Sequence, residues 1–286
     1  MIDLLTGQNA EVQTGVDGQQ SNAEVRAGIY SGKVFRIAAT PASLSLVASV
    51  EAALAAEFPG ETPHRKLQFE LPGDELFKRI GKLRAALLTD ATIRERLFAL
   101  LREQGFAATD NAVDLVRLRA VTHLGHENPL AAPAYTAHRD TWYANSQAQV
   151  NWWIPLHDVT EADTFAFYPN LFDKPVANNS GDFDYDEWMK TVGWQSTSGK
   201  RAVYPTADTA DYDTADGVPF ACNKGDIILF SAAHLHQTRK NASGLTRFSI
   251  DFRSVNLVDE AEGKGAINVD NASHGSAVKD YVNPEQ

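Results

Sequence analysis

A histidine and an aspartate two positions apart are the residues of this chain best suited to bind a metal ion. His138 and Asp140 lie in a stretch that reads as an extended strand, in which alternate side chains point to the same side. Two further histidines, His234 and His236, follow far downstream, and either could supply a third ligand. Two histidines and one carboxylate suit iron(II) and leave coordination positions open for a co-substrate and oxygen. Because a His-x-Asp pair alone is a weak signal, the segments around it must decide whether it is a site.

The segment after the downstream histidines alternates strictly between polar and apolar residues. It runs from Arg247 to Arg253, and between the two arginines Ser249 and Asp251 alternate with three apolar residues, Phe248, Ile250 and Phe252. If the apolar face packs on outer helices, the polar face, with Arg253, lies in or near a cavity. A guanidinium holds a carboxylate through two parallel charged hydrogen bonds, which lysine cannot copy. Arg247 is therefore a candidate to bind a carboxylate.

The segment 147–156 alternates in the same way. Gln149, Asn151 and Trp153 share one face, and Trp152 lies on the other. We expect Asn151 and Trp153 to line a pocket and Trp152 to pack outside it; the alternative is a core tryptophan beside solvated amides. The residues that we expect at a substrate are Trp142, Tyr143, Gln149 and Arg253.

Composition limits the possible classes of protein. The chain has 286 residues and a net charge of −11, so it lacks the clustered positive charge that nucleic-acid binding needs. One cysteine, Cys222, excludes an intramolecular disulfide and fits a reducing cytoplasm. We see neither a signal peptide nor an apolar run of the roughly 20 residues that a membrane helix needs. We therefore expect a cytoplasmic protein with no membrane partner; the sequence does not indicate an oligomeric state.

Short strands with turns between them predict a β-sandwich or β-barrel, and apolar residues at helical spacing predict flanking helices. We expect helices at 42–58, 74–88 and 90–104, and strands at 30–38, 113–121, 135–141, 147–156, 164–168, 220–222, 226–231 and 246–255. Residues 169–219, rich in aspartate and aromatic residues, interrupt the strands with one short helix at 185–192. A long insertion of this kind is more often a lid or binding loop than a linker, although its acids could equally be a solvated surface.

Taken together, these motifs resemble the phytanoyl-CoA dioxygenase-like branch of the iron(II)/2-oxoglutarate-dependent dioxygenases. The family carries His-x-Asp, a distant histidine, and an arginine ten or eleven residues beyond it. Arg247 lies eleven positions after His236, so the resemblance favours His236 over His234 as the third ligand. Asn241 and Ser243 also fall where the family has a short Asn-x-Ser turn.

The resemblance implies a fold and a site. The fold would be mainly β with flanking helices, a double-stranded β-helix or jelly-roll, cupin-like barrel. Iron(II) would bind His138, Asp140 and His236, and Arg247 would hold the distal carboxylate of 2-oxoglutarate, with a hydroxyl from Thr238. Trp153 and Asn151 would also contact this co-substrate. The expected single domain divides into a loose arm at 1–26, a strand and packing helices at 27–112, a jelly-roll core at 113–256 with the lid-like insertion 169–219, and a tail at 257–286.

The implied reaction uses O2 and 2-oxoglutarate, releases succinate and CO2, and hydroxylates a small polar substrate. The acidic insertion favours a cationic substrate. Related halogenases replace the carboxylate ligand with a small residue to admit chloride, so Asp140 disfavours halogenation. Desaturation, cyclisation or demethylation would begin with the same hydrogen abstraction. Two further alternatives are a cupin-type metalloenzyme that does not use 2-oxoglutarate, and a binding protein without activity on the same scaffold.

Overall fold

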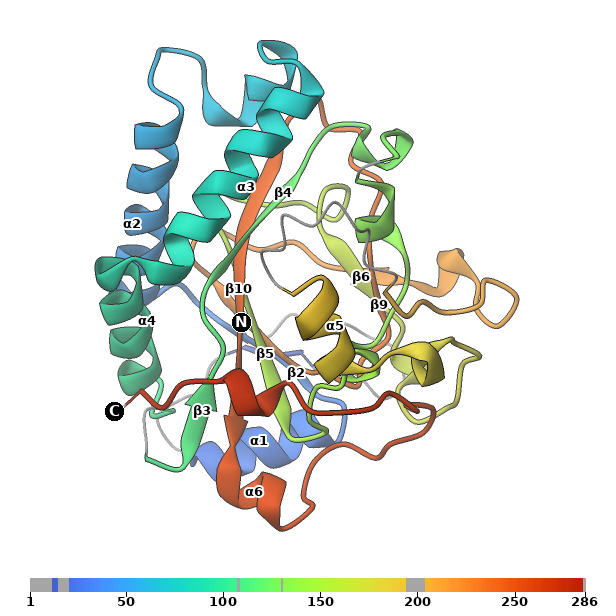
Figure 1. Ribbon diagram of the computed structural model, residues 1–286. Helices are drawn as coiled ribbons and strands as arrows, with labels where there is room; N and C mark the ends of the chain where they lie inside the picture. The colour runs from blue at the N-terminus through green and yellow to red at the C-terminus, as the bar shows by residue number, and fades with distance from the viewer. Residues whose placement is uncertain (1–11, 15–20, 107–108, 130, 194–203, 285–286) are drawn as a thin grey trace.

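Two β-sheets face each other in the computed structural model of the chain, and helices cover the outer side of the larger sheet (Figure 1). The structure describes residues 12–14, 21–106, 109–129, 131–193 and 204–284. The layers are therefore helices, large sheet and small sheet. This architecture confirms the predicted fold class, although the two sheets stay separate and do not close into one continuous barrel.

The larger sheet has the strand order β1-β2-β8-β5-β10-β3, with β4 also paired to β10. Neighbouring strands are antiparallel except β1 and β2. Its strands are β1 (Val12–Thr14), β2 (Val34–Ile37), β3 (Asn111–Val113), β4 (Arg117–Val121), β5 (Gln149–Pro155), β8 (Ile227–Ser231) and β10 (Arg247–Asn256). The smaller antiparallel sheet has the order β7-β6-β9, made of β6 (Phe165–Phe167), β7 (Val218–Pro219) and β9 (His236–Thr238).

Three helices pack on the outer face of the larger sheet, as the left side of Figure 1 shows. They are α2 (Pro41–Glu57), α3 (Gly73–Thr89) and α4 (Ala91–Glu103), close to the predicted ranges. Thr40 and Asp90 cap α2 and α4 by accepting backbone N–H groups, which satisfies donors that the first helical turn leaves free. The other helices are α1 (Asn22–Tyr30), α5 (Tyr185–Thr191) and α6 (Leu257–Ala261). Short 3-10 helices occur at His64–Phe69, Gly125–Glu127, Ala132–Tyr135, Asp140–Tyr143, Pro169–Leu171, Ser180–Asp182, Thr214–Asp216 and Val278–Asp280.

Alternation along β5 and β10 separates a core from an inner wall, as predicted. Trp152 and Ile154 of β5 join Phe248, Ile250 and Phe252 of β10 in the core under the helices. The intervening residues of both strands face the smaller sheet. Between the two sheets Trp153 packs in a second hydrophobic core. The other side chains of this core are those of Val34, Val159, Phe165, Phe167, Phe220, Cys222, Ile228 and Phe230.

Three sequence predictions of local structure are wrong. Residues 22–26, expected in a loose arm, begin α1, because Ser21 and Glu24 form a capping box; the strand expected from Tyr30 begins only at Val34. Residues 1–11 and 15–20 of the expected arm lie outside the described residues. The expected strand 135–141 reduces to one bridge between His138 and His236, flanked by two 3-10 helices. Alternation over so few residues does not distinguish a strand from a single bridge.

Across the residues that the structure describes, no helix combines the length and the apolar character that a membrane span requires.

Cys222 is predicted to resist alkylation in the native protein. Its thiol is buried between the two sheets, and burial raises its pKa to about 12. Since the thiolate is the reactive form, iodoacetamide should label the native chain far more slowly than a free cysteine. Mass spectrometry before and after unfolding in guanidinium checks this: one label should be added only after unfolding. Rapid labelling of the folded protein would contradict the burial.

Candidate metal centre

Three side chains from distant parts of the chain converge at one end of the space between the sheets. The bridge between His138 and His236 carries backbone hydrogen bonds of 3.1 and 3.0 Å and sets the two rings side by side, with centroids 4.4 Å apart. Asp140 begins the following 3-10 helix, and its Oδ1 lies 3.6 Å from His138 Nε2. One ligand atom from each of His138, Asp140 and His236 lies within 4.8 Å of the others. This spacing lets a single metal ion contact all three.

Both histidines are oriented as metal ligands. His138 Nδ1 lies 3.0 Å from the Thr136 carbonyl, and His236 Nδ1 lies 3.0 Å from the His234 carbonyl. A carbonyl only accepts hydrogen bonds, so each Nδ1 carries the proton and each Nε2 keeps its lone pair for the metal. Burial lowers the pKa of His236 to about 4, which keeps the imidazole neutral at physiological pH.

Asp140 is held by a chain of hydrogen bonds that ends in the C-terminal segment. Asn151 donates to Asp140 Oδ2 at 2.6 Å, Gln149 donates to Asn151 at 2.8 Å, and the Tyr281 hydroxyl donates to Gln149 at 2.7 Å. Burial by itself would raise the pKa of the Asp140 carboxyl, but the charge of Arg253, together with the neighbouring histidine rings, lowers it below its usual range. Asp140 is therefore a fixed carboxylate whose Oδ1 remains for a metal.

His234 does not belong to the metal cluster. Its ring is fully buried against Phe167 and Phe172, and its Nε2 lies 3.1 Å from the Gly32 carbonyl. The choice of His236 over His234 therefore agrees with the geometry.

Arg247 is placed to bind an anionic co-substrate. The residue is 3% exposed, yet its Nε and Nη1 have no hydrogen-bond partner among the residues that the structure describes. Its guanidinium carbon lies 5.6 Å from the centre of the Trp153 ring. Burial lowers the pKa of Arg247 to about 10, so it stays charged at neutral pH. An unpaired buried cation is costly, and a carboxylate such as the distal group of 2-oxoglutarate would satisfy it.

The sequence of the chain matches a family model for phytanoyl-CoA dioxygenase over residues 65–249. This match spans well over half of the chain and contains all three candidate ligands and Arg247. The chain belongs to the phytanoyl-CoA dioxygenase family. It is accordingly a non-heme iron(II)/2-oxoglutarate-dependent oxygenase, and the donor set and the unpaired Arg247 fit iron and this co-substrate. The family match favours this activity over the cupin-type and inactive alternatives.

Several solved structures are similar to this dioxygenase at low sequence identity. EvdO2 from Micromonospora carbonacea var. aurantiaca, also solved complexed with 2-oxoglutarate, is 14% identical; the alignment covers 83% of this chain and 91% of EvdO2, with a TM-score of 0.44. The alpha-ketoglutarate-dependent epimerase SnoN from nogalamycin biosynthesis is also 14% identical, with coverages of 82% and 84% and a TM-score of 0.39. The non-heme monooxygenase ThoJ is 15% identical, with coverages of 77% and 71% and a TM-score of 0.36. No curated protein matches the chain. The family assignment therefore rests on the match between the family model and residues 65–249, and not on these structures.

Of the remaining predicted residues of the dioxygenase, three lie at the site. Thr238 lies on β9, two positions from His236 and paired with Phe165. The Tyr143 ring lies 5.3 Å from the His138 ring, which is consistent with a pocket wall. Arg253 Nε lies 4.0 Å from Asp140 Oδ2.

Two predicted substrate contacts need correction, and one cofactor contact is refined. Trp142 is fully buried in a separate apolar cluster and donates its indole N–H to Asp270 at 2.8 Å, so it is not a pocket wall. Gln149 is also fully buried, and Asn151 and Tyr281 use its amide, so it positions Asn151 instead of contacting a substrate. Asn151, expected beside 2-oxoglutarate, contacts the metal ligand Asp140. The alternation of polar and apolar residues along a strand assigns a side chain to one face of the sheet. It does not identify the groups with which that side chain forms hydrogen bonds.

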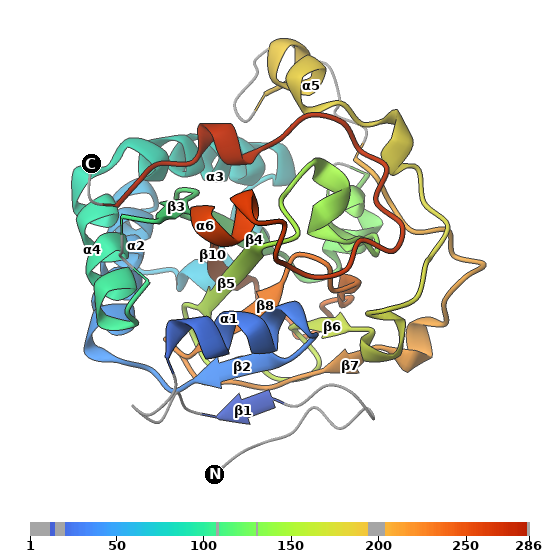
Figure 2. The same ribbon diagram turned by 90° about the horizontal axis from the view of Figure 1, so that it is seen from below.

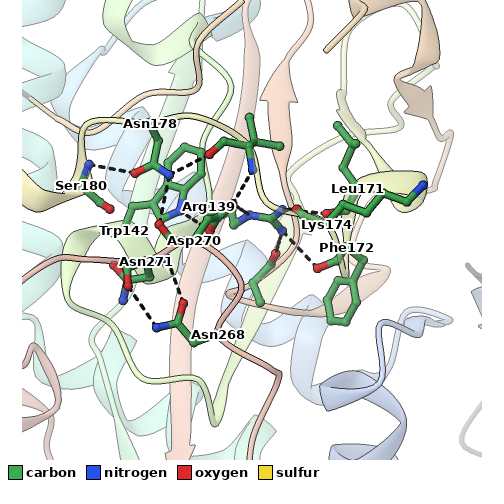
Figure 3. A network of polar contacts seen from close by, with 12 residues as sticks. Arg139, Trp142, Leu171, Phe172, Lys174, Asn178, Ser180, Asn268, Asp270 and Asn271 are labelled. Carbon is green, nitrogen blue, oxygen red and sulfur yellow. Dashed lines mark hydrogen bonds and ion pairs between the residues drawn. The ribbon is translucent and has the colours of Figure 1, made fainter. Parts of the chain in front are cut away.

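Sequence reasoning missed a buried network around Arg139, the residue between the first two ligands (Figure 3). Its guanidinium donates to Asp270 at 3.0 Å and to the backbone carbonyls of Leu171, Phe172, Lys174 and Ala233. Asp270 and Tyr281 come from the segment after α6, which runs back past α5 toward α4 (Figure 2). The polar, glycine-rich composition of that segment gave no signal of a role. The C-terminal segment therefore supports the dioxygenase site through two contacts, Asp270 with Arg139 and Tyr281 with Gln149.

Replacing Asn151 with alanine should weaken metal binding by this dioxygenase. The change removes the hydrogen bond that fixes Asp140 Oδ2, and losing such a partner of a metal ligand typically costs about 10–100-fold in affinity. Calorimetric titration of the apoprotein with Co(II) measures the change. The exposed Asn223→Ala variant is the control and should bind as the wild type does. An unchanged affinity in the Asn151 variant would show that Asp140 holds its position without the chain of hydrogen bonds.

Proposed function

We propose that this dioxygenase hydroxylates an unactivated C–H bond of a small polar metabolite, such as an amino-acid-like or natural-product intermediate, and releases succinate and CO2. The observation that carries the use of 2-oxoglutarate is Arg247, a buried guanidinium with unpaired N–H groups on the same inner wall as the site. When bound, iron(II), 2-oxoglutarate and O2 supply the oxidation itself. The protein's task is to bind, orient and shield these groups.

The residues of the chain divide that task. His138, Asp140 and His236 would hold the iron, and Arg247 would hold the distal carboxylate of 2-oxoglutarate against the Trp153 ring. Asp140 carries a carboxylate where related halogenases keep a small residue for chloride, which supports oxygen transfer over halide transfer. Desaturation, cyclisation and demethylation start from the same site and are the alternatives that product analysis must separate.

Aromatic side chains beside the ligands support a small-molecule substrate. The Tyr143 ring lies 6.0 Å from Phe183 and 5.6 Å from Tyr204, and both partners come from the predicted lid-like insertion. Rigid aromatic walls with a few polar groups are typical of pockets for small molecules. We therefore propose that the insertion covers the substrate.

The test has two stages. Anaerobic addition of Fe(II) and 2-oxoglutarate should produce the weak visible charge-transfer band of a chelated keto acid. Small metabolites are then screened for those that stimulate succinate release in air, and mass spectrometry should find one added oxygen atom in the product. Absence of the band would overturn the use of 2-oxoglutarate. A product that has lost two hydrogen atoms instead would overturn hydroxylation in favour of desaturation or cyclisation.

A further inference from the structure

The side chain of Tyr281 lies at the far end of the hydrogen-bond chain that holds Asp140. Its hydroxyl donates to Gln149 Oε1 at 2.7 Å, and Gln149 donates to Asn151 at 2.8 Å. Asn151 then donates to Asp140 Oδ2 at 2.6 Å. The first three members counted from the metal are buried, and Tyr281 is partly buried. Within the described part of the chain, no other group donates a hydrogen bond to Gln149 Oε1, so this oxygen depends on Tyr281.

The chemistry of the groups fixes the direction of this chain. An ionised carboxylate only accepts hydrogen bonds, so Asn151 must turn its amide nitrogen toward Asp140 and its oxygen toward Gln149. Gln149 must then turn its own nitrogen toward Asn151 and its oxygen toward Tyr281. Burial raises the pKa of the Tyr281 hydroxyl above its usual value, which keeps the proton that this oxygen needs. Hydrogen bonds in such a chain strengthen one another, so the last donor contributes to the first contact.

The C-terminal segment, red in Figure 1, is held on both sides of Tyr281. On one side, Asp280 accepts a hydrogen bond from the Tyr185 hydroxyl of α5 at 2.7 Å. On the other side, Val282 exchanges backbone hydrogen bonds of 2.8 and 2.9 Å with Val113 of β3. Because both neighbours are attached, we expect the backbone of Tyr281 to keep its place when one of these attachments is removed.

A second polar contact of Tyr281 is weaker. Its oxygen lies 3.3 Å from Asn145 Oδ1, and Asn145 donates to the backbone carbonyl of Asp140 at 2.8 Å. A phenol hydroxyl carries one proton, and the shorter distance of 2.7 Å assigns that proton to Gln149. The effect of Tyr281 on the carboxylate of Asp140 should therefore pass through Gln149 and Asn151.

We propose that Tyr281 is a positioning residue of the metal centre, which acts on Asp140 through the amides of Gln149 and Asn151. The hydroxyl keeps both amides in the direction that gives Asp140 Oδ2 a donor, and Oδ1 remains available to a metal ion. This role concerns the affinity of the centre for the metal, so it does not depend on which bond of a substrate the enzyme oxidises.

Calorimetric titration of the apoprotein with Co(II) tests this role. Tyr281→Phe should weaken Co(II) binding by about 3–10-fold, less than the loss of a direct partner of a ligand causes, because two amides lie between the hydroxyl and Asp140. Tyr185→Phe is the matched control, since it removes a hydroxyl whose hydrogen bond to the neighbouring Asp280 has the same length. The Co(II) affinity of Tyr185→Phe should equal that of the wild type.

A double-mutant cycle shows whether the effect passes along the chain of amides. In the Asn151→Ala background the chain is already broken, so adding Tyr281→Phe should weaken Co(II) binding no further. Gln149→Met breaks the same chain with little change in shape and should weaken binding at least as much as Tyr281→Phe. It also provides the measurement if Tyr281→Phe does not fold, which thermal unfolding of each apoprotein reports.

Three results would overturn the role of Tyr281. They are an unchanged Co(II) affinity in Tyr281→Phe and Gln149→Met, an equal loss in Tyr185→Phe, and a full additional loss in the double variant with Asn151→Ala. The last result would assign the effect to the contact with Asn145. Absence of the visible band with Fe(II) and 2-oxoglutarate in the wild type would overturn the proposed function and leave the Co(II) results unaffected.

Discussion

Replacing Arg247 with glutamine is expected to weaken 2-oxoglutarate binding by about a hundredfold or more. The charged pair of hydrogen bonds to the distal carboxylate would be lost, and hydrogen bonds to charged groups contribute about 1.5–3 kcal/mol each. Within the described part of the chain no group hydrogen-bonds to the Arg247 Nε and Nη1 atoms, so the variant should lose co-substrate affinity more than fold stability. Because the pKa of Arg247 is about 10, the wild-type site should bind 2-oxoglutarate well at neutral pH and lose affinity as the pH rises toward that value.

Anaerobic titration of the Fe(II)-loaded protein with 2-oxoglutarate measures this effect through the visible band. Co(II) binding should stay within a few-fold of the wild type, because Arg247 is not among the ligands. Arg247→Lys should recover only part of the affinity, since an ammonium group cannot form the two parallel bonds. Arg102→Gln, an exposed substitution on α4, is the matched control. Equal 2-oxoglutarate affinity in Arg247→Gln and the wild type would remove Arg247 from the co-substrate site.

Replacing Asp270 with alanine is expected to destabilise the protein by about 3–5 kcal/mol, the usual cost of removing one partner of a buried ion pair. The side chains of Arg139 and Asp270 are 1% and 5% exposed. Asp270 also accepts from the Trp142 indole at 2.8 Å and from the Val176 backbone at 3.0 Å (Figure 3). The variant would remove the ion-pair partner of the buried Arg139 guanidinium, which lies between two metal ligands in the sequence. Thermal unfolding should occur roughly 10 °C lower, since about 2–4 °C corresponds to 1 kcal/mol in larger domains.

Denaturant unfolding followed by circular dichroism measures the loss of stability. Glu262→Ala is the control, because Glu262 forms an exposed pair with Lys264, and exposed pairs contribute about 0–1 kcal/mol. Combining Asp270→Leu with Arg139→Met should recover part of the stability, since the double variant leaves no unpaired charge. A loss below about 1 kcal/mol in Asp270→Ala would mean that water replaces the carboxylate, and that the C-terminal segment contributes little to the site.

The chemistry of the centre and the layers around it could be predicted before the structure was known. The residue types of His138, Asp140 and Arg247 indicate metal ligands and a carboxylate-binding arginine, and the resemblance to the family selected His236 over His234 as the third ligand. The alternation along β5 and β10 correctly assigned one face to the helices and the other to the interior. The spacing of apolar residues along an element and the donor atoms of a side chain are local properties. They can therefore be read from a single amino-acid sequence.

The contacts between residues far apart in the chain could be read from the folded structure and not from the sequence. The folded structure placed Asp270 and Tyr281 behind the metal ligands and moved Trp142 and Gln149 from the expected pocket into supporting contacts. It also showed that Arg119 is exposed beside Asp251, which no spacing in the sequence indicates. Burial, hydrogen-bond partners and charge balance depend on the packing of segments more than a hundred residues apart. The ligand set could therefore be predicted, while the network of hydrogen bonds that holds it could not.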